Sequence, residues 1–224
     1  HNAAAGARVS VEYIRRRFSA HKNPDLIVRP FRAGNFSLAV LYIDGMSSRA
    51  EVNDFILRPL MQHDFTPLFA PSQLEQEVFN ILQVGNAQKR TTLDEGIRDL
   101  LMGDSLLLMD GVTFLIGCET KGFERRSVSP PQTEGAIKGS QEAFTENIKT
   151  NTTLIRRLIK NPKLIVEYTQ VGDMNQSPCA LLYVEGICNP AIVEEVKRRI
   201  GAIHGDLILG SGMLEQFIED NPFS

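Results

Sequence analysis

The fold is decided by the stretch Lys22-Asn23-Pro24-Asp25-Leu26-Ile27-Val28, because nearly the same stretch returns later as Lys160-Asn161-Pro162-Lys163-Leu164-Ile165-Val166. The two stretches differ only at their fourth position, where the first has Asp25 and the second has Lys163. Self-similarity of this kind is typical of a supersecondary unit that occurs more than once. The sequence therefore predicts two halves that share one plan.

The likeness continues on both sides of these stretches. Before them, Ile14-Arg15-Arg16 matches Ile155-Arg156-Arg157, and after them residues 39–45 match residues 180–186. Runs of β-branched and apolar residues predict two strands in each copy. Apolar residues at helical spacing predict a helix before and after each pair of strands, and Pro162 ends the helix of the second copy.

The first half continues beyond this plan. Capping boxes at Ser72-x-x-Glu75 and Thr92-x-x-Glu95 predict two further helices. The runs at 106–109 and 112–116, joined by Asp110-Gly111, predict a hairpin. Helical connections also permit parallel neighbours. The expected fold is α/β, with two small α/β subdomains that have mixed sheets, are related by the internal repeat and are joined by a linker.

The domain boundaries follow from composition. Residues 121–139 contain Gly, Ser and Pro and few apolar residues, as is typical of a linker. We therefore expect a first α/β subdomain at 8–120 and a second at 140–224. The second half has no counterpart of the last helix and hairpin of the first, so we expect a second subdomain truncated before these elements, with more protein after it.

Composition excludes several classes of protein. The 224 residues are 42% hydrophobic and carry a net charge of -3, which is ordinary for a globular chain and argues against generic nucleic-acid binding. The longest apolar runs are far shorter than the roughly 20 residues of a membrane-spanning helix, and the start does not resemble a signal peptide. The 3 cysteines form no C-x-x-C pair, which favours a reducing compartment.

The sequence contains none of the common catalytic motifs. It has no phosphate-binding glycine loop, no G-x-S-x-G turn and no Cys/His spacing suited to zinc. We therefore expect no enzymatic activity, no cofactor and no metal. Asp44, Asp110 and Glu185 each follow a strand-like run and precede a glycine. They are either ordinary turn residues or carboxylates that bind a cation or an amine.

Two groups of polar residues are candidate sites. In the first, Asn151 falls between Ile148 and Ile155 on the apolar side of a predicted helix, where a buried amide needs a partner. This group either ties the helix to the linker or to the other half, or binds a ligand, and it comprises Glu134, Lys138, Glu142, Asn147, Asn151 and Arg156. The second group consists of two basic triplets near helix ends. These favour the helix dipole, or meet an acidic partner or an anionic membrane surface; they are Arg15, Arg16, Arg17 and Lys197, Arg198, Arg199.

Several longer motifs are more specific than any of these residues. They are Pro130-Pro131-Gln132-Thr133-Glu134, Glu142-Ala143-Phe144-Thr145-Glu146, Thr150-Asn151-Thr152 and Leu214-Glu215-Gln216-Phe217-Ile218-Glu219-Asp220-Asn221-Pro222. Together they resemble the A subunit of spore nutrient-germinant receptors, the GerA family, most densely over residues 129–223. This chain departs from the family pattern Arg-Gly-Pro-Arg-Glu-Gly-Phe, because it has Lys-Gly-Ser-Gln-Glu-Ala-Phe at residues 138–144.

The resemblance implies the soluble N-terminal region of a protein of the spore inner membrane, followed by a hydrophobic region and facing the spore core. It also implies B and C receptor subunits as partners, with other A subunits as a further option, and a part in nutrient-triggered germination. Two roles stay open. The region either couples or assembles receptor subunits, or it binds a small nutrient in a cleft between the two subdomains.

Overall fold

A computed structural model describes residues 7–65, 71–122, 147–172 and 176–203. Its chain divides into two compact units between Pro162 and Lys163. Helix α6 (Ile148–Leu158) belongs to the first unit in this division, although the boundaries expected from composition assign it to the second subdomain. Residues 123–146, which include most of the expected linker at 121–139, lie outside the described parts, and the expected boundaries stay a prediction.

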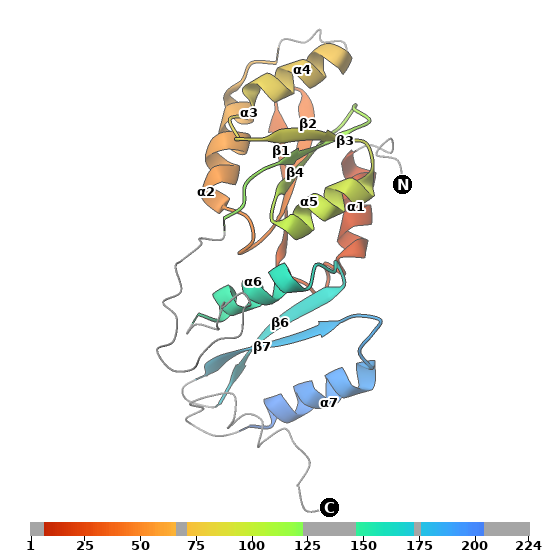
Figure 1. Ribbon diagram of the computed structural model, residues 1–224, viewed down its shortest axis with the longest axis vertical. Helices are drawn as coiled ribbons and strands as arrows, with labels where there is room; N and C mark the ends of the chain where they lie inside the picture. The colour runs from red at the N-terminus through yellow and green to blue at the C-terminus, as the bar shows by residue number, and fades with distance from the viewer. Residues whose placement is uncertain (1–6, 66–70, 123–146, 173–175, 204–224) are drawn as a thin grey trace, which may run out of the picture. The chain divides into compact units, whose positions relative to one another are not determined.

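The first unit is built on one sheet in the order β1-β2-β4-β5-β3, in which all neighbours are antiparallel. Its strands are β1 (Leu26–Ala33), β2 (Phe36–Ile43), β3 (Ala87–Arg90), β4 (Ser105–Met109) and β5 (Leu115–Cys118). The expected α/β class is confirmed, but the expectation of mixed sheets is wrong. A helical connection does not force parallel neighbours here, because the chain passes through the edge strand β3 before it returns to the sheet centre as β4 (Figure 1).

Helices cover both faces of this sheet. One face carries α2 (Arg49–Glu51), the π-helix η2 (Val52–Leu57), α3 (Arg58–Gln62) and α4 (Pro71–Ile81), and the other carries α1 (Ala7–Arg17) and α5 (Leu93–Met102). Successive side chains of a strand point to opposite faces. Val40 and Tyr42 of β2 accordingly enter the first core, whereas Leu41 and Ile43 enter the second. The central strands read as continuous apolar runs because both of their faces are buried.

The predicted helix start at Thr92 follows the local capping rule, whereas Ser72, the other predicted cap, lies within α4 (Pro71–Ile81). The side chain of Thr92 accepts a hydrogen bond from the Glu95 amide at 3.3 Å, and the Glu95 carboxylate accepts one from the Thr92 amide at 3.0 Å. This is the predicted capping box of α5. Ser48 caps α2 in the same way, by accepting from the Glu51 amide.

The turn after β4 is wider than predicted. Pairing between β4 and β5 reaches only to Leu107 and Ile116, so the chain does not turn back at a two-residue Asp110-Gly111 loop. The predicted first strand is therefore confirmed as β4, but the second strand begins at Leu115 and not at residue 112, and the predicted connection is wrong. Val112 and Phe114 leave the strand direction because they pack into the core beneath α4.

The second unit contains β6 (Leu164–Val171), β7 (Ser177–Val184) and α7 (Pro190–Gly201) in its described part. The two strands are antiparallel, and Leu164 faces Val184 just as Leu26 faces Ile43 in the first unit. Both hairpins also follow a helix and precede one. The hairpins thus agree in order and register, while the repeat of the two halves as a whole stays a prediction.

Candidate functional site

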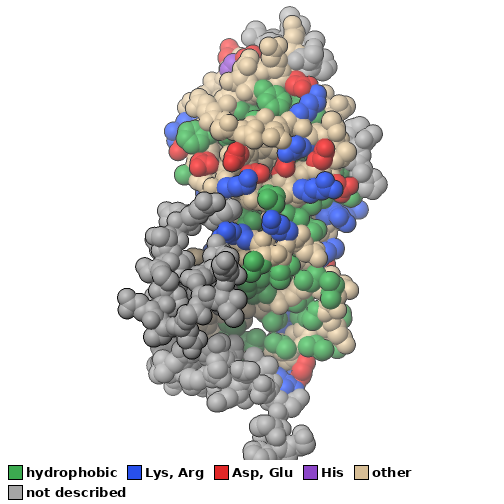
Figure 2. Space-filling model, viewed as in Figure 1, with side chains coloured by type: hydrophobic (Ala, Val, Ile, Leu, Met, Phe, Trp, Pro, Cys, Tyr) green, Lys and Arg blue, Asp and Glu red, His purple; other side chains and the backbone are tan. Residues whose placement is uncertain are grey.

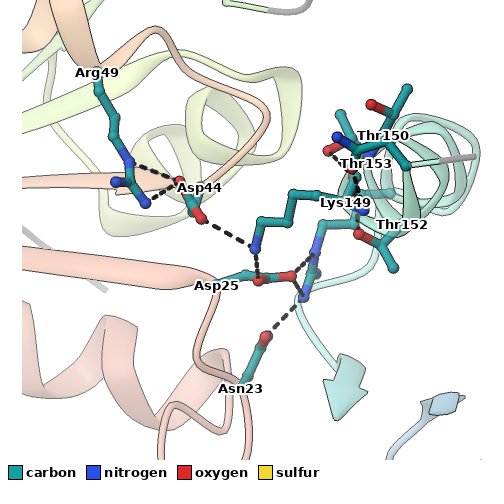
Figure 3. A network of polar contacts seen from close by, with 10 residues as sticks. Asn23, Asp25, Asp44, Arg49, Lys149, Thr150, Thr152 and Thr153 are labelled. Atoms are coloured by element: carbon teal, nitrogen blue, oxygen red, sulfur yellow. Dashed lines mark hydrogen bonds and ion pairs between the residues drawn. The ribbon is translucent and has the colours of Figure 1, made fainter. Parts of the chain in front are cut away.

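The strand ends of the first hairpin bring together residues that are well separated in sequence. Asp25 directly precedes β1 and Asp44 directly follows β2, and the Asp44 amide donates to the Asp25 carbonyl at 2.8 Å. Because β1 and β2 run in opposite directions, the start of β1 and the end of β2 lie at the same end of the sheet, and so do both carboxylates. Helix α6 lies against this end (Figure 3).

Two cations of α6 bind these carboxylates. Arg156 Nε donates to Asp25 Oδ2 at 3.0 Å, and Arg156 Nη2 donates to Asn23 Oδ1 at 2.7 Å. Lys149 Nζ lies 2.6 Å from Asp25 Oδ1 and 3.0 Å from Asp44 Oδ2. The side chains of Arg156 and Asp25 are only 4% and 2% exposed. A buried charge is tolerated when it is paired and hydrogen-bonded, and both conditions are met here.

Asp44 extends this network toward α2. Arg49 Nε donates to Asp44 Oδ1 at 2.9 Å, and Lys149 binds the other carboxylate oxygen. Burial by itself raises the pKa of Asp44, but the hydrogen bonds and positive charges of Lys149 and Arg49 outweigh it, so this pKa lies below its ordinary value of 3.8. Asp44 is therefore ionised at neutral pH and links α2 to α6.

The side of α6 that is buried is polar. Thr152, Thr153 and Arg156 are its buried residues, and both threonine hydroxyls donate to the Lys149 carbonyl, at 3.0 and 2.9 Å. Gly45 allows this close approach, because its φ of 83° favours glycine and a Cβ there would overlap the Thr153 hydroxyl. These bonds lie within the helix, so α6 is attached to the first hairpin by its two cations and by the close packing of Thr153 against Gly45.

This attachment corrects the predicted burial of the helix. The apolar stripe was expected to be the buried side, but Ile148 and Ile155 are only half-buried and Ile159 is exposed. Asn151 is half-buried as well. Helical spacing identified an apolar side correctly, but it carries no information about ion pairs with a hairpin that is distant in sequence. These ion pairs decide which side of α6 meets the first hairpin.

The structure places three members of the first candidate group. The side chain of Asn147 caps α6 by accepting from the amides of Lys149 and Thr150, at 2.9 and 3.3 Å. The backbone N–H of Asn151 donates to the backbone carbonyl of Asn147 at the start of the helix. Arg156 belongs to the buried network. The other members lie outside the described residues, namely Glu134, Lys138 and Glu142, and a ligand-binding role for the group stays a prediction.

The two basic triplets differ from each other. Arg15, Arg16 and Arg17 are all exposed on α1, and Arg16 lies 3.6 Å from Glu12. In contrast, the triplet of α7 is balanced by neighbouring carboxylates. Lys197 Nζ lies 2.7 Å from a Glu167 oxygen, and Arg198 and Arg199 share Glu195. The triplet of α1 is therefore the more available for a partner.

Charge is mixed over the visible surface of the first unit. Figure 2 shows Lys and Arg side chains interspersed with Asp and Glu on that face.

Hydrogen bonds from Arg198 and Arg199 lower the pKa of Glu195 to about 2, which shows how closely the acidic and basic groups of α7 are matched. Exposed pairs of this kind contribute little to stability.

Two of the acidic residues at the strand ends, Asp44 and Glu185, are both turn residues and carboxylates that bind an amine. The glycines after Asp44, Asp110 and Glu185 all have positive φ, as turns of this kind require. Asp44 and Glu185 also bind ammonium groups, because Lys149 lies 3.0 Å from Asp44 and Lys163 lies 3.2 Å from Glu185. The amines bound here are the protein's own lysines.

Sequence analysis did not identify Asn23, Asp25 or Lys149 as site residues. One signal was available, because the repeated stretches differ only where Asp25 is replaced by Lys163. That single difference falls at the centre of the network in the first unit. In the second unit the lysine instead pairs with Glu185 of its own hairpin.

Other kinds of site have less support. The described parts of the chain contain no group of three or more His, Cys, Asp or Glu side chains that could hold a metal ion. In the same parts, no helix combines the length and the apolar character needed to cross a membrane. An apolar void of about 10 Å³ in the first unit has room for roughly one water molecule; its lining is Val78, Leu107, Met109, Val112, Phe114 and Ile116.

Comparison with known proteins first defines the class of this domain. The fold matches the crystal structure of the N-terminal domain of the A subunit of the Bacillus megaterium spore germinant receptor GerK3, with a TM-score of 0.67 and 27% identity over 95% of this chain and 79% of that one. The family model for the Bacillus/Clostridium GerA spore germination protein matches residues 12–224. The chain therefore belongs to the GerA family.

Two similar proteins are spore germination proteins of Bacillus species. Spore germination protein KA of Bacillus subtilis (strain 168) is 34% identical over 203 residues, which are 89% of this chain and 37% of that protein. Spore germination protein GerLA of Bacillus cereus is also 34% identical over 203 residues, 89% of this chain and 41% of that protein. The chain thus spans less than half the length of these relatives.

Proposed function

We propose that this chain is the N-terminal domain of a germinant receptor A subunit and that it couples its two units through α6 during nutrient-triggered germination. The observation that carries this proposal is the buried attachment of α6 to the first hairpin by Arg156 and Lys149. The matching solved domain, which belongs to an A subunit, supports the receptor assignment.

The position of α6 in the chain makes it suited to coupling. It ends at Leu158, and β6 of the second unit begins at Leu164, so only a short segment containing Pro162 separates them. Proline restricts the backbone of such a segment. A displacement of the second unit would therefore be passed to a helix that charged, geometrically specific bonds hold to the first hairpin.

The proposed receptor setting is based on membership of the GerA family. In the proposed setting the full-length protein resides in the spore inner membrane, this domain faces the spore core, and the B and C subunits or other A subunits are its partners. Purification of the full-length protein from spore membranes tests these points. We expect the other receptor subunits to co-purify with it, and their absence would contradict an assembly role.

Lys149 offers a direct test of coupling. Lys149→Met removes one ammonium group that is 35% exposed and bridges α6 to two carboxylates. Lys163→Met is the matched control, because this lysine is 39% exposed and its carboxylate partner lies in its own hairpin. We expect spores that carry the Lys149 variant of the full-length protein to germinate more slowly with nutrient, at unchanged protein level. A normal response of these spores would refute coupling through α6.

The alternative role is binding of a small nutrient. It has less support among the described residues, because Asn147 caps α6 and Arg156 is held by Asp25 and Asn23. Thermal unfolding of the chain with amino acids, sugars and nucleosides tests it, since a ligand at 100 times its dissociation constant adds about 2.7 kcal/mol of stability. We expect no saturable shift. A shift that Asn151→Ala abolishes would instead assign nutrient binding to this domain.

A further inference from the structure

Strand β7 matches β2 in sequence but has fewer strand neighbours. Residues 39–45 match residues 180–186, and both strands end just before an acidic residue and a glycine. In the first unit β2 lies between β1 and β4, whereas among the described residues β7 pairs only with β6 (Figure 1). In the described part of the second unit, one edge of β7 is therefore open where the matching edge of β2 is paired.

The backbone groups at this open edge follow from one hydrogen bond. The Glu185 amide donates to the Lys163 carbonyl at 2.9 Å, so these two residues are a hydrogen-bonded pair. Along an antiparallel strand, successive residues direct their amide and carbonyl groups to opposite sides. Leu181 therefore points its amide toward β6, whereas Ala180 and Leu182 point theirs away from it.

The matching residues of β2 show what such an edge binds. Ala39 and Leu41 lie opposite Leu108 and Leu106 of β4, and residues 38–43 are all buried. Residues 179–184 of β7 are equally apolar but only half-buried. A row of unpaired amides and carbonyls on an apolar strand is a template for one more strand. The sequence of β7 is thus that of a central strand, although its described neighbours leave it at an edge.

The turn after β7 is uncovered as well. In the first unit Met46 is 1% exposed, and the Gly122 amide donates to its carbonyl at 3.0 Å. The hydroxyl of the next residue, Ser47, donates to the Gly103 carbonyl at 2.8 Å. Ile187 is the residue that matches Met46, and it is 80% exposed. The cover over the first turn comes from residues next to α5 and β5, which follow β2 in the chain.

We propose that the open edge of β7 binds a strand of the same protein that follows residue 224, and that the turn before this strand covers Ile187. The strand is the counterpart of β4, so it is antiparallel to β7 and apolar on both faces, as Ser105–Met109 is. The offset that relates residue 39 to residue 180 places its start about 20 residues after Ser224. The pairing would join the second unit to the rest of the protein by main-chain hydrogen bonds.

A later segment of the same protein fits this edge better than a second copy does. The neighbour of β2 comes from its own chain, and the relatives described above are more than twice as long as the region that they match. A strand within the same chain also pairs at a high effective concentration, whereas two separate molecules lose translational freedom when they associate. The proposal goes beyond coupling through α6 and does not depend on it.

Hydrogen exchange at single amides of the full-length protein tests the pairing. The amides of Ala180 and Leu182 should exchange as slowly as that of Leu181, which faces β6, because bonded strand amides exchange only when the strand opens. In the 224-residue chain, Ala180 and Leu182 should exchange at least about 100-fold faster than Leu181. Fast exchange of Ala180 and Leu182 in the full-length protein would overturn the proposal. Slow exchange of both in the 224-residue chain would do so too, because the partner would then lie within that chain or in a second copy.

A photo-crosslinking amino acid at Ile187 of the full-length protein identifies what covers the turn. We expect a crosslink within one chain, to a peptide after residue 224 that contains an apolar run of strand length. Ala180→Pro removes an amide of the open edge and should lower the yield at least about tenfold. Gln170→Pro is the matched control, because its amide faces the outer edge of β6, the edge at which β1 carries Pro30. It should leave the yield unchanged.

Three crosslinking results would refute this pairing. A crosslink between two copies would assign the edge to self-association, and one to a different protein would assign it to a subunit interface. A crosslink to a peptide within residues 1–224 would place the cover inside this chain. Normal germination of Lys149→Met spores together with the expected crosslink would refute coupling through α6 and leave the strand pairing intact.

Discussion

Replacing Asp25 by Asn should detach α6 from the first hairpin and destabilise the first unit strongly. Asp25 accepts from Arg156 at 3.0 Å and binds Lys149 at 2.6 Å while only 2% of its side chain is exposed. An amide at this position has one acceptor oxygen, and its NH₂ group would face cationic donors. Arg156 would then stay buried without a carboxylate.

The size of the effect follows from this burial. Breaking a buried ion pair by removing one partner destabilises a protein by about 3 to 5 kcal/mol. Lys149 retains Asp44 as a partner and Arg156 retains Asn23, so we expect the lower end, about 3 kcal/mol. For a chain of this length each kcal/mol shifts the melting temperature by about 2 to 4 °C, which gives a decrease of about 6 to 12 °C.

Asp54→Asn is the matched control. It makes the same chemical change in another carboxylate that pairs with an arginine, since Asp54 lies 2.9 Å from Arg58, but these side chains are 44% and 63% exposed. Exposed pairs of this spacing contribute about 0.3 to 0.5 kcal/mol. Differential scanning calorimetry of the two variants at pH 7 measures the difference. Equal melting temperatures, within about 1 °C, would show that the buried network does not hold α6.

Three further changes test other parts of the structure. The pKa of Asp44 is lowered in the fold, so its ionised form stabilises the protein at pH values above the ordinary pKa of 3.8. This stabilisation is lost as the pH falls below that value. Urea unfolding at pH 7 and pH 3 should therefore show a smaller acid-induced loss of unfolding free energy for Asp44→Asn than for the parent. Gly96→Ala should destabilise the protein by about 1 to 3 kcal/mol, because the new Cβ would lie 2.8 Å from a Leu106 methyl carbon. In Gly201→Ala the new Cβ meets nothing within 4 Å, so this change should stabilise the protein by up to about 1 kcal/mol. Denaturant unfolding that ranks the two variants in the opposite order would contradict this packing. Burial raises the pKa of the Cys118 thiol to about 12, so iodoacetamide at pH 8 should modify it only after unfolding, and mass spectrometry that finds native Cys118 alkylated would disprove its inaccessibility.

Local sequence determined most of the helices and strands of this protein and their order. The helix before and after each of the hairpins β1–β2 and β6–β7, the caps at Ser48 and Thr92, and the α/β class all follow from signals carried by a few neighbouring residues. The long apolar runs of β2 and β4 also indicated central strands, because a strand that is covered on both faces needs no polar side. These signals lie within short stretches of sequence, so they can be recognised without the tertiary structure.

Other features depended on contacts across the chain. β3 has the sequence Ala-Gln-Lys-Arg, which carries no strand pattern, and it is a strand because β5 pairs with it. The antiparallel order of the sheet likewise depends on where the chain re-enters it. Backbone pairing of this kind is available to almost any residue, so it leaves little trace in the sequence.

The candidate site shows the same division. The sequence indicated a turn after Asp44 and a helix that includes Arg156, and both are present. Only the tertiary structure joined them, because Asp25 and Arg156 are 131 residues apart in the chain and meet at 3.0 Å. The strength of a buried ion pair depends on distance and on exclusion of water, and both are set by the packing of α6 on the first hairpin rather than by the residues that surround either charge in sequence.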